Sequence, residues 1–478
     1  MKKNIIFIYI FLILSSCTND FIDLIPVSSV TVDIIYKTDK DFSDALTATY
    51  NPIRTQYRDF WMFGDVRADD SWEEYPKNND MSYSDLFTLH SGHGLVNNAW
   101  QRYYQAIFRT NIILGKIEDL DETVIPNKKR YIGEARFLRA FCYFDLVRIF
   151  GDVPAVTKDI SVQDAYQTPR SSIGNIYNEI IIPDLIAAET SLLARYTGND
   201  VGRPTIGAAK AILGRVYLTI GDFQKAESKL MEVTSLGYDL VDEYNDLFDY
   251  SNKRHSEYIF NIEFQNGVNG GSPFSNSFLP NFPEMCSFFG VTGQGLENNS
   301  PSREFITLFE ENDKRKEICI GIPGGYYNDA GEFRPLPVFT CQTYTKKYIA
   351  RTQANEDSPA DWKVIRYADV LLMLAEAMNE NGKTAQAIPY LNQIRKRAGI
   401  SELSVAMSQA ETRDAIVHER RLELCFEGHR WFDLVRWGKA YEVMRPLGMQ
   451  SHMTVFPIPL TQVQLIDDPA ILPQNPGY

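Results

Sequence analysis

Apolar residues recur every three to four positions over much of the chain, and this period predicts helices. Residues 42–57 and 97–120 show it, and another helix follows Pro126 through the string GEARFLRAFCYFDLVRIF. Side chains three or four positions apart lie on one face of an α-helix, so each segment has an apolar stripe to bury. The pattern therefore predicts a mostly α protein.

Two later segments share a spacing typical of tetratricopeptide repeats. In residues 213–230 a Leu is followed after thirteen positions by Ala226 and after four more by Leu230, and residues 374–391 repeat these offsets. Small residues at such places let two antiparallel helices approach closely, and each hairpin buries its face against a neighbour. With the divergent helices before residue 150 and the segment 411–441, we expect roughly four helical hairpins in a tetratricopeptide-like solenoid scaffold.

Residues 411–441 read as a helix, a break at Gly428 and a second helix rich in aromatic side chains. We interpret this segment as a packing joint of the scaffold, because it combines a strong apolar stripe with many charges. The charged pairs expected along its helix faces, at a spacing of three, are Glu427 with Arg430 and Asp433 with Arg436.

Two regions interrupt the helical pattern with loops rich in Gly, Asn, Pro and aromatic residues. The first is the insertion 59–94, and the second is a strand-poor lobe with short strand-like pieces at 258–264 and 343–348. Long irregular segments in a compact domain are usually functional or disordered, and their aromatic content argues against disorder. The expected parts of the chain are a signal peptide (1–16), a tether (17–40), an N-terminal helical region (41–237), the irregular lobe (238–363) and a C-terminal helical region (364–478).

The N-terminus predicts export and lipid attachment. Lys2 and Lys3 precede an apolar run at residues 5–14, which is the length of a signal peptide and too short to span a bilayer. The following Leu-Ser-Ser-Cys is similar to the lipobox of bacterial lipoproteins, in which cleavage leaves Cys17 as an acylated N-terminus. Acyl chains such as palmitate would then hold the protein to membrane lipid, since each buried methylene contributes roughly 0.8 kcal/mol.

The net charge and the cysteine content limit the classes of ligand that the chain is expected to bind. The net charge of −14 argues against nucleic acid as a partner. The cysteines other than Cys17 are odd in number, and their spacing is not that of metal ligands. The sequence leaves the disulfide state of Cys286, Cys319 and Cys341 undecided, and a Cys319–Cys341 disulfide is one candidate pairing.

Three stretches resemble the SusD/RagB family of nutrient-binding lipoproteins on the surface of Bacteroidetes-type bacteria. They are HERRLELCFEGHRWFDLVRWG at residues 418–438, the helix of residues 133–156 with its Gly-Asp-Val-Pro end, and residues 301–315, which resemble a helix ending in Asp-x-Arg. The resemblance implies a glycan-binding lipoprotein that passes oligosaccharide or polysaccharide to a SusC-like TonB-dependent transporter. Asp20 and Asp23 beside Cys17 resemble the acidic segment that accompanies export to the outer face of the outer membrane.

Two loop regions carry the residue types that recognise a neutral sugar. Flat aromatic faces suit the apolar C–H side of a pyranose, and carboxylates and amides suit its hydroxyl groups. The alternative is that these rings only attach the loops to the scaffold. The candidate glycan-binding residues are Asp69, Asp70, Trp72, Tyr75, Asn78, Phe274, Phe288 and Phe289.

The same loops do not predict an enzyme. A glycosidase needs two carboxyl groups about 5 to 10 Å apart across a cleft, and the adjacent Asp69 and Asp70 rarely face each other in that way. With Asp65 they would suit a structural calcium ion, although the twelve-residue calcium-loop signature is absent. We therefore expect no cofactor. The alternatives to a glycan-binding protein are a RagB-like oligopeptide-binding protein and a helical-repeat adaptor without a small ligand.

Overall fold

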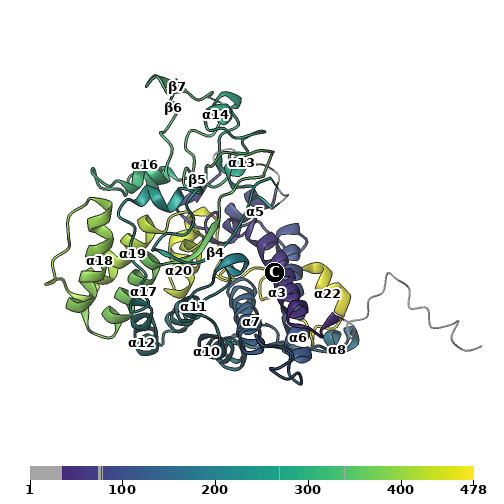
Figure 1. The fold of residues 1–478 in the computed structure, drawn as a ribbon. Helices are drawn as coiled ribbons and strands as arrows, with labels where there is room; N and C mark the ends of the chain where they lie inside the picture. Colours follow the sequence, from purple (N-terminus) through teal and green to yellow (C-terminus); the bar gives the residue numbers. More distant parts are fainter. Residues whose placement is uncertain (1–34, 74–76, 78, 268–269, 339) are drawn as a thin grey trace, which may run out of the picture.

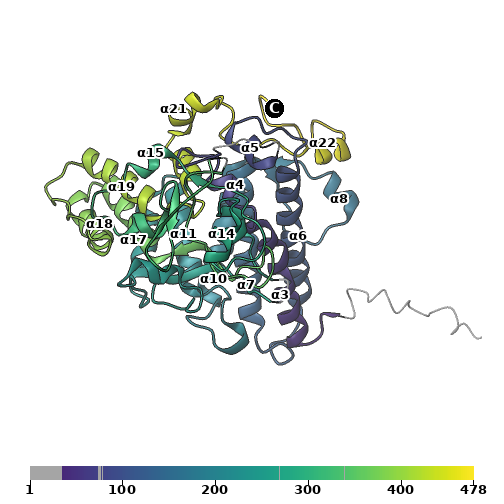
Figure 2. The same cartoon turned by 90° about the horizontal axis from the view of Figure 1, so that it is seen from above.

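The predicted helices form a scaffold of stacked hairpins in a computed structural model, which describes residues 35–73, 77, 79–267, 270–338 and 340–478. Successive helices lie side by side across the molecule, from α3 and α6 to α17 and α18 (Figures 1 and 2). The paired helices are α3 (Asp39–Tyr57) with α6 (Gly94–Ile117), α7 (Lys128–Phe150) with α10 (Ile182–Ser191), α11 (Ile206–Thr219) with α12 (Phe223–Thr234), and α17 (Tyr367–Glu380) with α18 (Thr384–Ala398). This confirms the mostly α, tetratricopeptide-like fold.

The small residues of the repeat allow the close approach that their spacing predicted. A Cβ atom on Gly214 of α11 would lie 2.6 Å from Leu230 Cδ2 of α12, so any larger residue would push the two helices apart. The hydroxyl of Thr205 caps the start of α11, and the Asp222 carboxylate caps the start of α12. Local capping and side-chain size therefore specify this hairpin together.

The segment 411–441 has the expected break but is not a further repeat. It forms α19 (Gln409–Glu423), α20 (Arg430–Arg436) and α21 (Ala440–Met444), and Gly428 in the turn has φ +77°. Helix α19 lies against α17 and α18, whereas α20 lies against α4 (Trp61–Gly64). The expectation of a divergent repeat hairpin was wrong, because the turn sends α20 to a different part of the fold.

One of the two predicted charge pairs in this segment is present. Arg436 Nε lies 2.8 Å from Asp433 Oδ1, as the helical spacing predicts. The prediction that Glu427 pairs with Arg430 was wrong. Glu427 lies in the turn, outside any helix, and its carboxylate binds Lys347 and Arg366 instead.

A short antiparallel strand pair crosses the core. β4 (Tyr258–Ile262) pairs with β8 (Trp362–Arg366), whereas the expected strand at 343–348 forms a bridge from Thr345 to Ile320 in place of a ladder. The other strands are β1 (Ser71–Trp72), β2 (Val153–Pro154), β3 (Arg170–Ser171), β5 (Ser300–Pro301), β6 (Gly325–Tyr327) and β7 (Phe333–Pro335). The short helices are α5 (Asp80–Asp85), α8 (Val162–Tyr166), α9 (Ile173–Ile176), α13 (Phe274–Phe278), α14 (Pro283–Phe288), α15 (Arg303–Ile306), α16 (Arg315–Cys319) and α22 (Leu460–Ile466).

The cysteines are packing residues in this fold. All five that the structure describes are buried and outside any disulfide, so the candidate pairing of Cys319 with Cys341 is not formed. Cys341 instead lies beside the Thr343 carbonyl, with Sγ 2.6 Å from its oxygen. Among the described helices, none has the length and apolar character needed to cross a bilayer.

Candidate functional site

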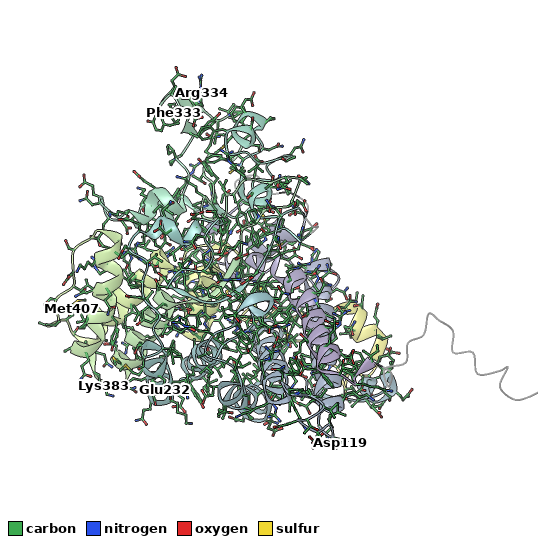
Figure 3. The ribbon with its side chains drawn as sticks, viewed as in Figure 1. Asp119, Glu232, Phe333, Arg334, Lys383 and Met407 are labelled. Carbon is green, nitrogen blue, oxygen red and sulfur yellow. The ribbon has the colours of Figure 1, made fainter. Side chains whose placement is uncertain are left out.

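The irregular segments form a lobe that projects from the helical scaffold. We call it the aromatic lobe and define it as residues 270–301 and 320–358, without residue 339. It includes α13, α14 and the β6–β7 hairpin, which projects farthest from the helices (Figure 1). Figure 3 shows Phe333 and Arg334 at its far end, whereas Glu232 and Lys383 lie on the helical side of the molecule. Binding residues often gather on such loops, because the rigid scaffold positions them.

Three rings gather on the outer part of this lobe. Phe288 and Phe289 are half-buried, and their ring centroids lie 5.0 Å apart in an edge-to-face arrangement. The Tyr326 ring lies 4.9 Å from that of Phe288. Beneath them a small core containing Leu279, Met285 and Val291 supports the rings. Phe288 and Phe289 thus have a fixed position and keep part of each ring open to solvent.

The tip hairpin adds two rings that the sequence analysis did not select. Tyr327 on β6 and Phe333 on β7 are 53% and 45% exposed, and their centroids lie 5.5 Å apart. Apolar rings this exposed are typical of an interaction surface when they cluster. The string Asn-Asp-Ala-Gly between the two strands is a turn signal, and it would have predicted a hairpin here.

The structure brings the two predicted loop regions together. Trp72 on β1 pairs with Ser300 on β5, so the insertion 59–94 and the aromatic lobe share a strand pair. Lys77 Nζ donates a hydrogen bond of 2.6 Å to the Leu296 carbonyl, across the same junction. The Trp72 indole is partly exposed, and the Arg303 guanidinium lies 5.3 Å from its ring centroid. Trp72 therefore lies at the junction of the two loop regions, with the Arg303 guanidinium over its ring.

Asp69 and Asp70 hold the insertion onto the α19–α20 segment. Arg430 binds Asp69 through two hydrogen bonds of 2.8 and 2.9 Å, and Arg421 binds both aspartates. Burial opposes ionisation of Asp69, but the hydrogen bonds and charge of Arg430 lower its pKa overall. Burial raises the pKa of Asp70 to about 6 despite the charge of Arg421. Both carboxylates pair with arginines, and Asp70 Oδ2 is buried without a hydrogen-bond partner among the described residues. Their contact with sugar stays a prediction.

Phe274 belongs to the hydrophobic core. Its side chain has no exposed surface, and its ring lies 5.3 Å from Trp362 and 5.4 Å from Tyr348 between centroids. Its prediction as a glycan contact was wrong, because its position on α13 turns the ring toward β8. The other candidates Tyr75 and Asn78, like the lipidation candidate Cys17, lie outside the described residues.

Among the described residues, Asp65, Asp69 and Asp70 of the insertion are not arranged as a cation site. Asp65 accepts a hydrogen bond of 2.7 Å from the Gly428 N–H, and Asp69 and Asp70 bind arginines. Within the described ranges, no group of three or more His, Cys, Asp or Glu side chains is arranged to hold a metal ion. The arrangement therefore gives no support to the structural calcium ion considered from the sequence.

A helical-repeat scaffold that presents a projecting, ring-rich loop lobe defines a binding protein. Comparisons with known proteins agree. A model of the SusD family matches residues 241–453, and a model described as starch-binding and associating with the outer membrane matches residues 20–218. The chain therefore belongs to the SusD family.

Individual relatives match over most of the chain. SusD-like protein P38 of Formosa agariphila is 29% identical, over 100% of this chain and 99% of that protein. The starch-binding protein SusD of Bacteroides thetaiotaomicron is 24% identical, over 78% of this chain and 76% of that protein. Among solved structures, a laminarin-binding SusD-like protein superimposes with a TM-score of 0.79 at 28% identity, covering 93% of this chain and 100% of that one.

Proposed function

We propose that this protein binds oligosaccharides or polysaccharides at the cell surface through its aromatic lobe. The observation that carries the proposal is the pair of partly exposed rings formed by Phe288 and Phe289. Such rings stack on the apolar face of a pyranose, and their rigidity limits the entropy lost on binding. The laminarin-binding relative supports a glycan ligand over an oligopeptide.

The chain would act by binding and without catalysis. Asp69 and Asp70, the adjacent carboxylates of the insertion, are committed to Arg421 and Arg430 on one side of the loop. They do not face each other across a cleft, which a pair of glycosidase carboxylates must do. Acylated Cys17 would anchor the protein in the outer membrane facing outward, and a SusC-like transporter would receive the glycan.

Replacing both lobe rings tests glycan binding. We expect Phe288→Ala/Phe289→Ala to weaken binding to laminarin or starch by roughly tenfold or more, because each aromatic stacking contact contributes about 0.5–1.5 kcal/mol beyond its buried area. Affinity electrophoresis through gels containing each polysaccharide measures the change, and calorimetry with defined oligosaccharides confirms it.

Phe108→Ala is the matched control, because Phe108 is 48% exposed on α6 in the scaffold. It should leave binding unchanged. If the wild-type protein is retarded by no glycan in a broad panel, or if the double variant and the control bind alike, the aromatic lobe is not a glycan site.

A further inference from the structure

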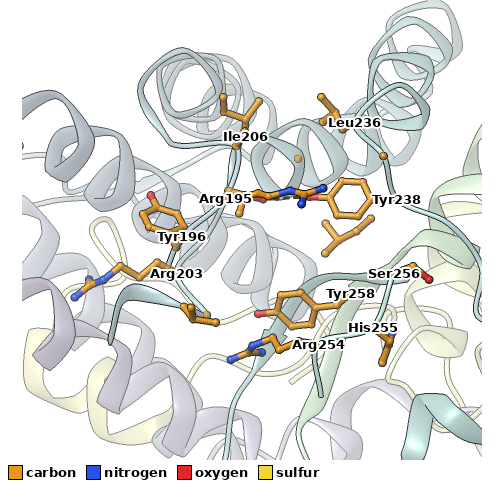
Figure 4. Close-up of a pocket in the computed structure, with 17 residues that line it drawn as sticks. Arg195, Tyr196, Arg203, Ile206, Leu236, Tyr238, Arg254, His255, Ser256 and Tyr258 are labelled. Atoms are coloured by element: carbon orange, nitrogen blue, oxygen red, sulfur yellow. Dashed lines mark hydrogen bonds between the residues drawn. The ribbon is translucent and has the colours of Figure 1, made fainter. Parts of the chain in front are cut away.

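A cavity apart from the aromatic lobe opens between the helical repeats and β4. Its volume is about 380 Å³, and its walls come from the loops after α10 and α12 and from the start of β4. Figure 4 shows Tyr238 and Tyr258 on opposite sides of this space, with Arg195 extended toward Tyr238. The volume falls within the range of about 300–1,000 Å³ that is typical of small-molecule sites.

A second cavity adjoins the first and shares part of its lining. Residues 201–203 line both cavities, and the second has a volume of about 410 Å³. Its far side is formed by Tyr50, Asn51 and Arg54 of α3, and by the end of β4. The two cavities therefore make adjoining compartments, enough for more than one sugar unit.

Glycines allow the walls to approach so closely. Gly202 has φ +103°, and a Cβ atom there would lie 2.8 Å from Glu263 Oε1. A Cβ atom on Gly207 would lie 2.2 Å from the Tyr238 hydroxyl, so this ring packs directly on the backbone of α11. The Tyr238 hydroxyl also lies 3.3 Å from Thr205 Oγ1, which fixes the ring as one flat wall of the first cavity.

The charges of the two compartments are unbalanced. Arg203 pairs with two scaffold acids, and Arg254 pairs with Glu263. Arg54 and Arg195, one in each compartment, have no acidic partner in the part of the chain that the structure describes. Although the net charge of −14 repels anions at long range, two unpaired guanidinium groups beside adjoining cavities favour an anionic ligand locally.

Neutral hydrogen-bonding groups complete the walls. The amides of Asn51, Asn199 and Asn261 line the second compartment. In the first, His255 Nδ1 is buried and has no hydrogen-bond partner among the described residues. The asparagine amides can donate hydrogen bonds to ligand hydroxyl groups and accept them.

We propose that these adjoining cavities form a second carbohydrate site, specific for an acidic oligosaccharide. Sugar carboxylates pair with Arg54 and Arg195, the Tyr238 ring stacks on a sugar face, and the asparagine amides bind hydroxyl groups. The site does not share residues with the aromatic lobe, so its failure would leave the proposed function of that lobe intact.

Trigalacturonic acid is a suitable probe, and its fully methyl-esterified form is a matched neutral ligand. We expect calorimetry to show binding of the acid that weakens as salt is added, and binding of the ester at least about tenfold weaker. Arg54→Gln/Arg195→Gln should weaken binding of the acid by about tenfold or more, since each replacement removes a charge-assisted hydrogen bond.

Arg445→Gln is the charge control, because it removes an exposed arginine of the chain outside both cavities. It should bind the acid as the wild type does. Circular dichroism of each variant checks that it is folded. The proposal is overturned if the wild type does not bind the acid, if the ester binds equally well, or if the double arginine variant keeps its affinity.

Discussion

Asp65, in the turn after α4, shows how burial determines the state of one side chain. Its carboxylate is buried, and it accepts hydrogen bonds from the Gly428 N–H at 2.7 Å and from Asn299 Nδ2 at 3.4 Å. Burial raises the pKa of Asp65 to about 8, and these hydrogen bonds only partly offset the effect. The folded protein therefore holds a proton on Asp65 over a pH range in which the unfolded chain has released it.

This proton predicts a pH-dependent effect of Asp65→Asn. A group whose pKa is raised on folding contributes stability below its unfolded pKa of about 4, and this contribution is lost as pH rises through the folded value. The wild type should lose stability between about pH 5 and pH 8 relative to Asp65→Asn, which has no proton to lose. Urea unfolding at several pH values, followed by tryptophan fluorescence, measures the difference.

The exposed substitution Asp329→Asn is the control, and it should follow the wild type at every pH. Asn299 Oδ1 has no hydrogen-bond partner among the described residues, so a flipped Asn299 amide can accept from the new amide at position 65. A constant difference between Asp65→Asn and the wild type would contradict the raised pKa.

For single residues, the sequence indicated which side chains have the chemistry to bind a sugar, but it did not indicate which of them are exposed. Trp72, Phe288 and Phe289 are partly exposed. Phe274 lies in a stretch of similar amino-acid composition, but its ring packs inward against Trp362, which is 88 positions away in the chain. A loop without a regular period does not reveal which of its rings face the core, because that depends on the distant strand it covers.

At the scale of elements, Arg366 at the end of β8 connects the β4–β8 strand pair to the α19–α20 segment through ion pairs. Its guanidinium lies 2.6 Å from Glu423 and 2.8 Å from Glu427, and 2.6 Å from Glu257 just before β4. All of these groups are buried. Burial opposes ionisation of Glu427, but the charges of Arg366 and Lys347 lower its pKa to about 2.

Loss of Arg366 should destabilise the whole fold. Arg366→Met leaves three buried carboxylates with fewer cations, and removing one partner from a buried ion network typically costs about 3–5 kcal/mol. Urea unfolding at neutral pH measures the change. Arg413→Met is the control, because Arg413 pairs with Glu380 while 46% exposed, and it should change stability by at most about 1 kcal/mol. Equal losses in both variants would show that the buried network does not stabilise the fold.

The elements themselves were largely predictable, whereas their charged contacts were not. Periodicity placed helices at 42–57 and 97–120, and the structure has them at Asp39–Tyr57 and Gly94–Ile117. Spacing along a helix predicted the bond of Asp433 to Arg436. It failed for Glu427, because the partners of this side chain, Lys347 and Arg366, come from other parts of the chain.

For the whole molecule, the proposed lipid anchor and transporter partner can be tested together. The proposed transfer of glycan predicts that the lipidated protein co-purifies with a large β-barrel transporter after mild detergent extraction. A Cys17→Ala variant should be released from the membrane fraction, because it lacks the acylated residue. Immunoblotting of the fractions measures both effects. Purification of the wild type without a transporter would contradict the proposed partner. Retention of Cys17→Ala in the membrane fraction would contradict the proposed lipid anchor.

The attachment of the aromatic lobe has an evolutionary consequence. Its base is tied to the body by the β1–β5 pair and by buried contacts of α13, whereas the β6–β7 turn extends into solvent. Replacements in that outer turn leave the helical repeats untouched, so they carry little penalty for folding. The outer turn can thus vary in sequence while the helical body stays the same.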